Sequence, residues 1–326
     1  MVTPAIPNPP QRALLLINRA SRSGGERVAP VLERLRGGGL ELEIPDEGVD
    51  WCQLIDARRE QVDCVIVGGG DGSLNAVAPA LIASQLPLGI LPLGTANDLA
   101  RTLKIPDDPL AAADIILEAH EHPVDVGVVN GRHFFNVANI GFGAATADNL
   151  SPRMKKALGP LSYLASVLLA LRSSLEPFHA DIVCDGRRQR VKSIQIAVGN
   201  GRYYGGGMAI AHEARIDDQL FFLYSVQPLR LWDMFKLIPA LRTGHFRGHD
   251  PVLVDRGSKV EIVTRKPKRV SADGEQVTKT PALFELRPCA VRIRVPVSYM
   301  TSFAARPGSG NDQQQRPPVP LGHHKD

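Results

Sequence analysis

The chain has 326 residues, of which 44% are hydrophobic and 22% are charged, a composition that excludes disorder everywhere except at the two ends. Its length predicts two domains of roughly 130 to 170 residues each. The net charge of +4 favours an anionic ligand or an anionic membrane surface, and it gives no indication of nucleic acid binding.

Strands and helices alternate through the first part of the chain. In chain order the pattern is strand 13–17, helix 28–35, helix 51–55, strand 62–67, helix 74–82 and strand 88–91. Because only crossover connections join parallel neighbours, this alternation predicts a parallel sheet covered on both faces. We therefore predict a doubly wound, Rossmann-like α/β domain over residues 12–130.

The pattern changes near residues 125–135 to alternating, turn-punctuated strands. Strands at 182–184 and 191–198 flank an Asp185-Gly186 turn and predict a hairpin, and 252–263 continues the strand pattern. Helical stretches at 158–171 and 231–241 interrupt this region. We predict a β-rich domain over 131–303, with disordered tails at 1–11 and 304–326.

The first motif lies where a strand ends and a helix begins. Gly68, Gly69, Gly70 and Gly72 frame Asp71, so that backbone amides can approach a phosphate at a helix N-terminus, with Ser73 as a candidate N-cap. A carboxylate among such amides indicates an intervening Mg²⁺, and we expect Asp71 to lie on the loop surface with little packing. The GxGxxG and Walker patterns are absent. A turn formed for packing alone is the alternative.

The second motif also follows a strand and opens a helix. Gly94, Thr95, Asn97 and Asp98 lie next along the chain, and in a doubly wound sheet they can face the same crevice as the first motif. The alternative is that Asn97 or Asp98 merely caps a helix.

The two motifs, Gly69-Gly70-Asp71-Gly72-Ser73 and Pro92-Leu93-Gly94-Thr95-Ala96-Asn97-Asp98, resemble the catalytic domain shared by diacylglycerol, sphingosine and bacterial lipid kinases. The resemblance extends from Asn18 through Asn136, Gly141 and Gly143 to Ala272-Asp273-Gly274-Glu275. It implies a nucleotide domain and a β-sandwich-like domain with the active site between them. It also implies ATP as phosphate donor, Mg²⁺, and a lipid hydroxyl as acceptor.

Carried over residue by residue, the resemblance implies Glu275 as the general base, with Asp71 and Asp98 holding or orienting magnesium. The residues implied for the nucleotide are Asn18, Gly69, Gly70, Asp71, Gly72, Ser73, Asn75, Gly94, Thr95 and Asn97. Without the resemblance, the preferred interpretation of Asp273-Gly274-Glu275 is a two-residue hairpin turn with a solvated glutamate.

Bacterial members also carry an accessory Mg²⁺ site at an Asp-Gly-x-Leu segment, which we align with Asp217-Asp218-Gln219-Leu220. The resemblance implies the Asp217 side chain and the carbonyls of Ala214 and Gln219 as ligands. The chain departs from the family pattern at Arg19 (proline in the family), Ser73 (threonine), Ala76 (acidic) and Asp218 (glycine). The last departure leaves the accessory metal geometry open.

The rival functions are a sugar-phosphate kinase or an NAD kinase, which share the first motif, and a nucleotide-sensing module without turnover. Asp71, Asp98 and Glu275 are all present, which favours an enzyme. The sequence does not identify the lipid, and a homodimer remains open. Four cysteines without a CxxC pair indicate a reducing cytoplasm.

We expect the protein to reach a lipid substrate by docking at the membrane from the cytoplasm. The apolar side chains at helical spacing are Trp232, Phe235, Ile238 and Leu241, and the nearby basic residues are Lys236, Arg242 and Arg247. An apolar face of this kind is more often a core face than a membrane contact. The basic run at 265–269 is a solvated face or a second membrane contact.

Overall fold

The computed structural model describes residues 10–18, 28–141, 176–211, 214–228 and 252–304. The helices predicted at 158–171 and 231–241, with the predicted membrane contacts of the second, lie outside these residues. So do Arg19, Gly143 and almost all of the two predicted tails. No helix in the described ranges is long and apolar enough to cross a membrane.

The first half of the chain forms a parallel sheet. Its strands lie in the order β2 (Glu41–Glu43), β1 (Arg12–Ile17), β3 (Cys64–Gly69) and β4 (Leu88–Pro92). Every residue of β3 and β4 is buried, as expected for strands covered on both faces. The predicted α/β architecture is confirmed.

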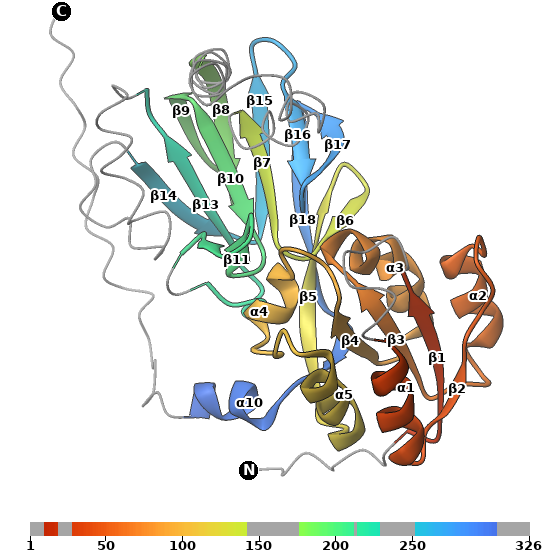
Figure 1. Cartoon of the computed structure of the whole chain (residues 1–326). Helices are drawn as coiled ribbons and strands as arrows, with labels where there is room; N and C mark the ends of the chain where they lie inside the picture. The colour runs from red at the N-terminus through yellow and green to blue at the C-terminus, as the bar shows by residue number, and fades with distance from the viewer. Residues whose placement is uncertain (1–9, 19–27, 142–175, 212–213, 229–251, 305–326) are drawn as a thin grey trace, which may run out of the picture.

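Helices cover both faces of this sheet (Figure 1). Helices α1 (Val28–Gly37) and α5 (Pro109–Glu118) pack together, while α2 (Trp51–Arg58) packs against α3 (Asp71–Ser84). The starts of two helices follow from their caps, because the side chains of Asp50 and Asp108 accept hydrogen bonds from the first amides of α2 and α5.

The second half of the chain adds a six-stranded antiparallel sheet. Its order is β14 (Val252–Gly257), β13 (Phe221–Val226), β10 (Gln195–Gly199), β7 (Val137–Gly141), β16 (Arg269–Ala272) and β17 (Glu275–Lys279). A separate core beneath it contains the rings of Phe134, Phe221 and Phe284, with centroids 6.0 to 6.4 Å apart. The predicted β-rich, sandwich-like second part is confirmed.

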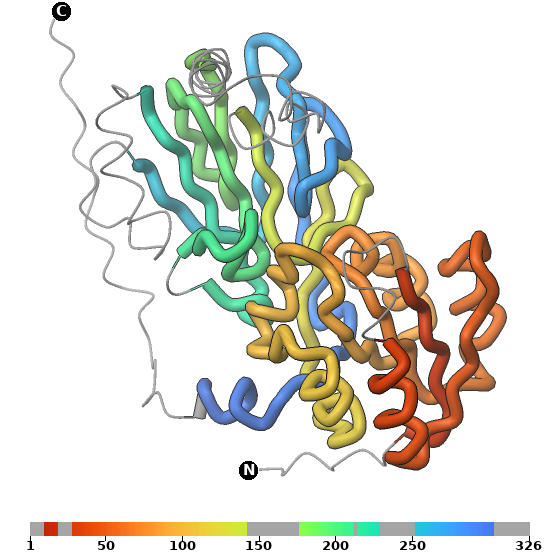
Figure 2. The backbone as a smooth tube through the Cα atoms, viewed as in Figure 1, coloured from red at the N-terminus to blue at the C-terminus, as the bar shows by residue number. Residues whose placement is uncertain are grey.

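The layer opposite this sheet is an extension of the first sheet. It contains β18 (Ala282–Arg294), β15 (Lys259–Thr264), β8 (Phe178–Cys184) and β9 (Arg187–Ser193). The pairing of strands continues from β4 through β18 into this layer, and Figure 2 shows the layer above the α/β part.

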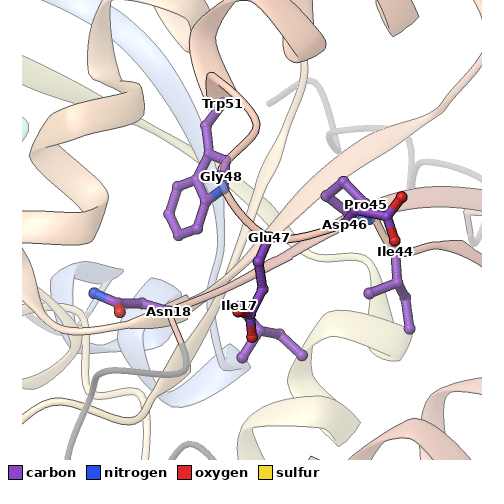
Figure 3. A pocket seen from close by; sticks show the side chains of 8 residues that line it. All are labelled: Ile17, Asn18, Ile44, Pro45, Asp46, Glu47, Gly48 and Trp51. Carbon is purple, nitrogen blue, oxygen red and sulfur yellow. The ribbon is translucent and has the colours of Figure 1, made fainter.

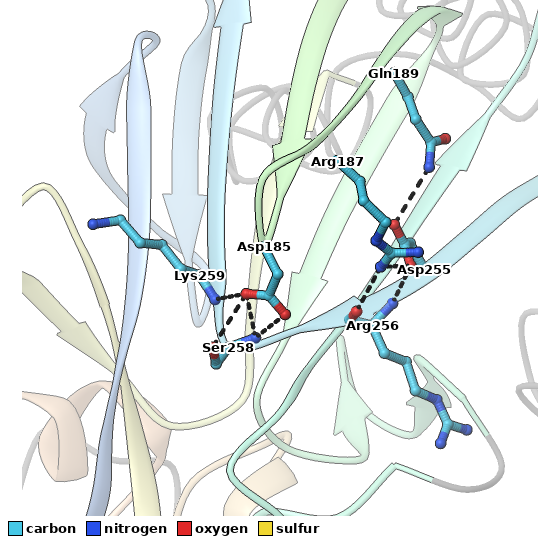
Figure 4. A network of polar contacts seen from close by, with 7 residues as sticks. All are labelled: Asp185, Arg187, Gln189, Asp255, Arg256, Ser258 and Lys259. Atoms are coloured by element: carbon cyan, nitrogen blue, oxygen red, sulfur yellow. Dashed lines mark hydrogen bonds and ion pairs between the residues drawn. The ribbon is translucent and has the colours of Figure 1, made fainter. Parts of the chain in front are cut away.

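The predicted hairpin is formed by β8 and β9. Asp185 and Gly186 both have positive φ (45° and 82°), as a two-residue turn requires. Figure 4 shows the Asp185 carboxylate accepting hydrogen bonds from the amides of Ser258 and Lys259, and Arg187 paired with Asp255 at 2.7 Å. These contacts fix the hairpin to the β14–β15 connection.

Strand β18 belongs to both halves. Its first part pairs with β15, and Ile293 near its end pairs with Leu88 of β4, while β5 (Glu121–Val129) runs antiparallel beside it and pairs in turn with β6 (Arg132–Phe134). The core of the α/β half includes Ala290, Val291, Ile293 and Val295, together with Tyr299 of α10 (Val297–Ala304). The limits 12–130 and 131–303 remain a prediction, and the last strand crosses them.

Candidate functional site

Two glycine-containing loops meet at the carboxyl ends of β3 and β4. A Cβ atom on Gly94 would lie 2.5 Å from Gly70 Cα and 2.7 Å from Asn97 Oδ1. The Leu93 amide donates to the Gly69 carbonyl at 3.0 Å. Only glycines allow these backbones to approach so closely. The two predicted motifs therefore lie together.

The N-terminus of α3 faces this junction. The N-cap is Gly70, which has no side chain to cap the helix, whereas Ser73, the predicted cap, lies inside the first turn and is buried. Ser73 Oγ instead accepts a hydrogen bond from Asn18 Nδ2 at 3.0 Å. Because the first amides of a helix have no partner within it, this uncapped end is suited to a phosphate group.

The Asp71 carboxylate is held by hydrogen bonds from the second loop and from the β-rich half. Its Oδ2 accepts from the Asp98 amide at 3.0 Å, and its Oδ1 accepts from the Leu99 amide at 2.9 Å and from Asn136 Nδ2 at 3.1 Å. Asp71 therefore caps helix α4 (Asp98–Thr102), whose own N-cap residue, Asn97, makes no side-chain capping bond. The expectation of a loop-surface carboxylate with little packing is wrong, because Asp71 is half-buried between two helix ends.

Asp98 lies beneath the loops. It is buried, and its Oδ2 accepts from the Gly206 amide at 3.0 Å, in the turn between β11 (Tyr203–Tyr204) and β12 (Met208–Ala209). Burial, reinforced by the neighbouring carboxylate of Asp71, raises the pKa of Asp98. Thr95, by contrast, is exposed at the crest of the second loop.

Asp273 joins the two halves of the site. Its carboxylate accepts from the amides of Phe135 (2.8 Å), Asn136 (3.1 Å) and Val137 (2.9 Å), and from Asn75 Nδ2 on α3 (2.9 Å). Neither Asp273 nor Asn136 was assigned a role from the sequence. An aspartate at the start of a two-residue turn is a signal for the turn, but it does not indicate which distant groups will bond its carboxylate.

Glu275 follows this turn at the start of β17. It is exposed, and its Oε1 lies 3.1 Å from the point that a Cβ on Gly72 would occupy. The β-rich half thus places a carboxylate over the glycine loop of the α/β half. Glu275 therefore lies close to the loop that carries Asp71, and Asp71 in turn bonds the amide of Asp98.

Several oxygen atoms around these carboxylates have no hydrogen-bond partner among the described residues. They are the buried Oδ1 atoms of Asn75, Asp98 and Asn136. Oxygen ligands of this kind are those that Mg²⁺ prefers, so the donor set fits the ion. No group of three or more His, Cys, Asp or Glu side chains with metal-binding geometry occurs in the described ranges.

The segment predicted as an accessory metal site lies on a different part of the molecule. Asp217 accepts from His122 Nε2 at 2.6 Å and from Arg215 Nε and Nη2 at 2.8 and 2.9 Å. Although burial alone would raise it, the bonds from His122 and Arg215 lower the pKa of Asp217 to about 2. Both oxygens already contact basic side chains, so this carboxylate does not fit a metal ion.

The backbone of this segment also differs from the alignment. Gln219 has φ +59°, which is the conformation that favours glycine, whereas Asp218 was placed at the glycine position. The backbone therefore favours a glycine at position 219 and not at position 218. Burial raises the pKa of Asp218 to about 6, and Ala214 is buried nearby in sequence.

A cavity of about 280 Å³ opens beside Asn18 at the end of β1. Figure 3 shows its lining residues, among them the Trp51 indole and the side chains of Asn18 and Glu47. Because Asn18 also bonds Ser73, the cavity adjoins the N-terminus of α3. A pocket next to an uncapped helix N-terminus is suited to a nucleotide whose phosphates face that helix.

Comparison with known proteins covers both halves. A diacylglycerol kinase catalytic domain model matches residues 12–129, and a YegS C-terminal NAD kinase beta sandwich-like domain model matches 136–295. The chain is similar to the "Probable lipid kinase YegS-like" proteins of Klebsiella pneumoniae (strain 342) and Pseudomonas aeruginosa (strain UCBPP-PA14). The first is 34% identical over 88% of this chain and 96% of the relative, and the second is 32% identical over 87% and 94%.

A solved structure of a diacylglycerol kinase from Bacillus anthracis str. Sterne superposes with a TM-score of 0.73 at 26% identity. The superposition covers 89% of this chain and 98% of that one. Sequence and structure therefore agree over nearly the whole described body, and the chain belongs to the YegS-like family of lipid kinases.

Proposed function

We propose that the protein transfers the γ-phosphate of ATP, in the presence of Mg²⁺, to the hydroxyl group of a membrane lipid. One observation carries this proposal: Glu275, from the β-rich half, stands over Gly72 of the glycine loop in the α/β half. A carboxylate at this distance from a phosphate-binding loop can accept a proton at the point of phosphoryl transfer.

The uncapped N-terminus of α3 would bind the phosphates, with Gly70 and Gly94 allowing close approach. The adenosine would occupy the cavity beside Asn18, against Trp51. The unpartnered oxygens of Asn75, Asp98 and Asn136 would hold Mg²⁺. The metal would supply positive charge to the transferring phosphoryl group.

In the proposed reaction, the protein's own side chains carry out one chemical step, which is a proton transfer. The lipid hydroxyl oxygen bonds to the γ-phosphorus while the bond from that phosphorus to ADP breaks, and Glu275 accepts the hydroxyl proton. Asp273, two residues before, fixes the turn from which Glu275 projects. Asp71 fixes the second loop against the first.

The test replaces Glu275 with Gln, which keeps the shape but cannot accept the proton. Turnover of radiolabelled ATP is measured with diacylglycerol, phosphatidylglycerol and a sphingoid base in separate mixed micelles. We expect a fall of roughly 10² or more in kcat, with ATP affinity unchanged in equilibrium dialysis. The matched control is Glu261→Gln, an exposed glutamate on β15. A Glu275→Gln protein with near-native kcat would remove the general-base assignment.

The same assay identifies the acceptor. Turnover with one lipid class and none with the others names the substrate, while ATP binding without turnover on any acceptor would favour the sensing module. Trp51→Ala tests the adenosine site, because loss of a stacked ring weakens nucleotide affinity and leaves the phosphate loop intact. Unchanged ATP affinity in that variant would mean that the adenine ring does not bind against Trp51.

A further inference from the structure

Strands β9, β8 and β15 form one layer of the β-rich half (Figure 1). A groove of about 360 Å³ on this layer is lined by His179 and Asp181 from β8, Arg190 from β9, Val263 from β15 and Arg265 just after it. All of these residues are on the surface, and Val263 is 39% exposed. The function described above uses none of them.

Strand register gathers basic side chains on this face. Lys192 lies opposite His179, Arg190 opposite Asp181, and Arg188 opposite Val183, so that the three basic residues of β9 project from the same side of the sheet. The turn after β15 adds further basic residues at its edge, which are Arg265, Lys266 and Lys268.

One acidic residue is present in the groove, and it is already neutralised. Asp181 pairs with Arg190 at 2.9 Å and with Arg188 at 3.5 Å. No acidic partner lies within ion-pair distance of Lys192, Arg265 or Lys266 among the described residues. Unneutralised cations beside an exposed valine suit a negatively charged, partly apolar surface.

The groove is connected along the chain to the proposed catalytic turn. The basic turn leads from β15 into β16, which belongs to the facing six-stranded sheet, and the opposite end of β16 leads through Asp273 to Glu275. The groove and the proposed base therefore both belong to the β-rich half, on its two different sheets.

We propose that this face, centred on Lys192, Arg265 and Lys266, docks the protein on membranes that contain anionic phospholipid, with a headgroup phosphate in the groove. The inference rests on the proposed lipid-kinase function, which requires a substrate in a bilayer. It is independent of the basic and apolar residues predicted around 231–247.

The test measures sedimentation of the full chain with vesicles of phosphatidylcholine alone or mixed with phosphatidylglycerol, across a salt series. The variant combines Lys192→Gln, Arg265→Gln and Lys266→Gln. Each basic residue near an anionic surface contributes about fivefold to binding, so we expect the variant to bind on the order of a hundredfold more weakly. Binding of the wild type should weaken as salt rises.

The matched control removes the same charge from the α/β half, by Arg12→Gln, Arg36→Gln and Arg59→Gln, all of which are exposed positions. Thermal unfolding of both variants verifies that they are folded. Equal vesicle binding by the variant and the control would overturn the proposal. A second result would also overturn it: the wild type binds inorganic phosphate at matched ionic strength, and the variant loses this binding but binds vesicles as before. The groove would then bind a soluble anion.

Turnover on lipid in neutral detergent micelles separates this proposal from the proposed function. A wild type that binds anionic vesicles through these residues but phosphorylates no lipid would retain the docking surface and overturn the kinase reaction. If the wild type phosphorylates lipid in micelles and the variant binds vesicles normally, the kinase reaction is retained and the docking surface is overturned.

Discussion

Replacing Asp273 with Asn should cost the protein both stability and turnover. The carboxylate accepts from three consecutive amides, of Phe135, Asn136 and Val137, and from Asn75. In the variant an NH₂ group replaces one oxygen and faces at least one of these donors, whichever way the amide turns. Hydrogen bonds to a charged group contribute roughly 1.5 to 3 kcal/mol each, so we expect the free energy of unfolding to fall by about 3 kcal/mol.

The catalytic effect follows from position. Glu275 lies two residues after Asp273, and a displacement of about 1 Å at a reacting group can cost roughly a hundredfold in rate. We therefore expect kcat to fall at least tenfold, even in protein that is fully folded at the assay temperature.

Denaturant unfolding and ATP turnover measure the two effects. The control is Asp114→Asn, an exposed aspartate paired with Arg34 on the surface, which should change the unfolding free energy by less than about 0.5 kcal/mol. If Asp273→Asn matched this control in both assays, Asp273 would not be the residue that joins the two halves.

Three further changes test the loops and the acidic segment. Gly94→Ala should lower the unfolding free energy by about 2 kcal/mol and weaken ATP binding, because its Cβ meets backbone, whereas Gly37→Ala, with nothing within 4 Å, should do neither. Asp71→Ala removes the cap of α4, so denaturant melts should show a loss of about 1 to 2 kcal/mol along with lost turnover; unchanged stability would contradict the capping role. For Asp217, the folded-state pKa of about 2 lies below the ordinary 3.8, so its pairing stabilises the protein above pH 4 by about 2 kcal/mol, and this contribution disappears as pH falls through 2. Unfolding of Asp217→Asn should accordingly differ from wild type at pH 5 and converge with it at pH 2, and a constant difference would be inconsistent with the depressed pKa.

The parts of the fold that the sequence predicts are those with local causes. Continuous apolar runs predict the buried parallel strands, and the Asp185-Gly186 turn predicts its hairpin, because burial and positive φ each favour particular residue types. The glycine loops are predicted together for the same reason, since each follows a parallel strand and the carboxyl ends of such strands share one edge.

The parts that the sequence does not predict depend on distant partners. The alternating pattern of β18 is the same whether it pairs with β15 or with β4, so nothing local indicates that it joins both. The bond from the Asp98 amide to Asp71 spans 27 residues, and that from Asn75 to Asp273 spans 198. Gln219 adopts a conformation that favours glycine, and its residue type gives no indication of this backbone geometry.

The place of β18 in the first sheet also sets the order in which the protein can fold during synthesis. β4 leaves the ribosome some two hundred residues before Ile293, its partner in β18, and the core around it stays open until Tyr299 has been made. Apolar surface of the α/β half is therefore exposed for most of translation, which is the condition under which nascent chains aggregate or recruit chaperones. We expect a fragment ending near residue 130 to carry every residue of the phosphate loops and still fail to remain soluble on its own.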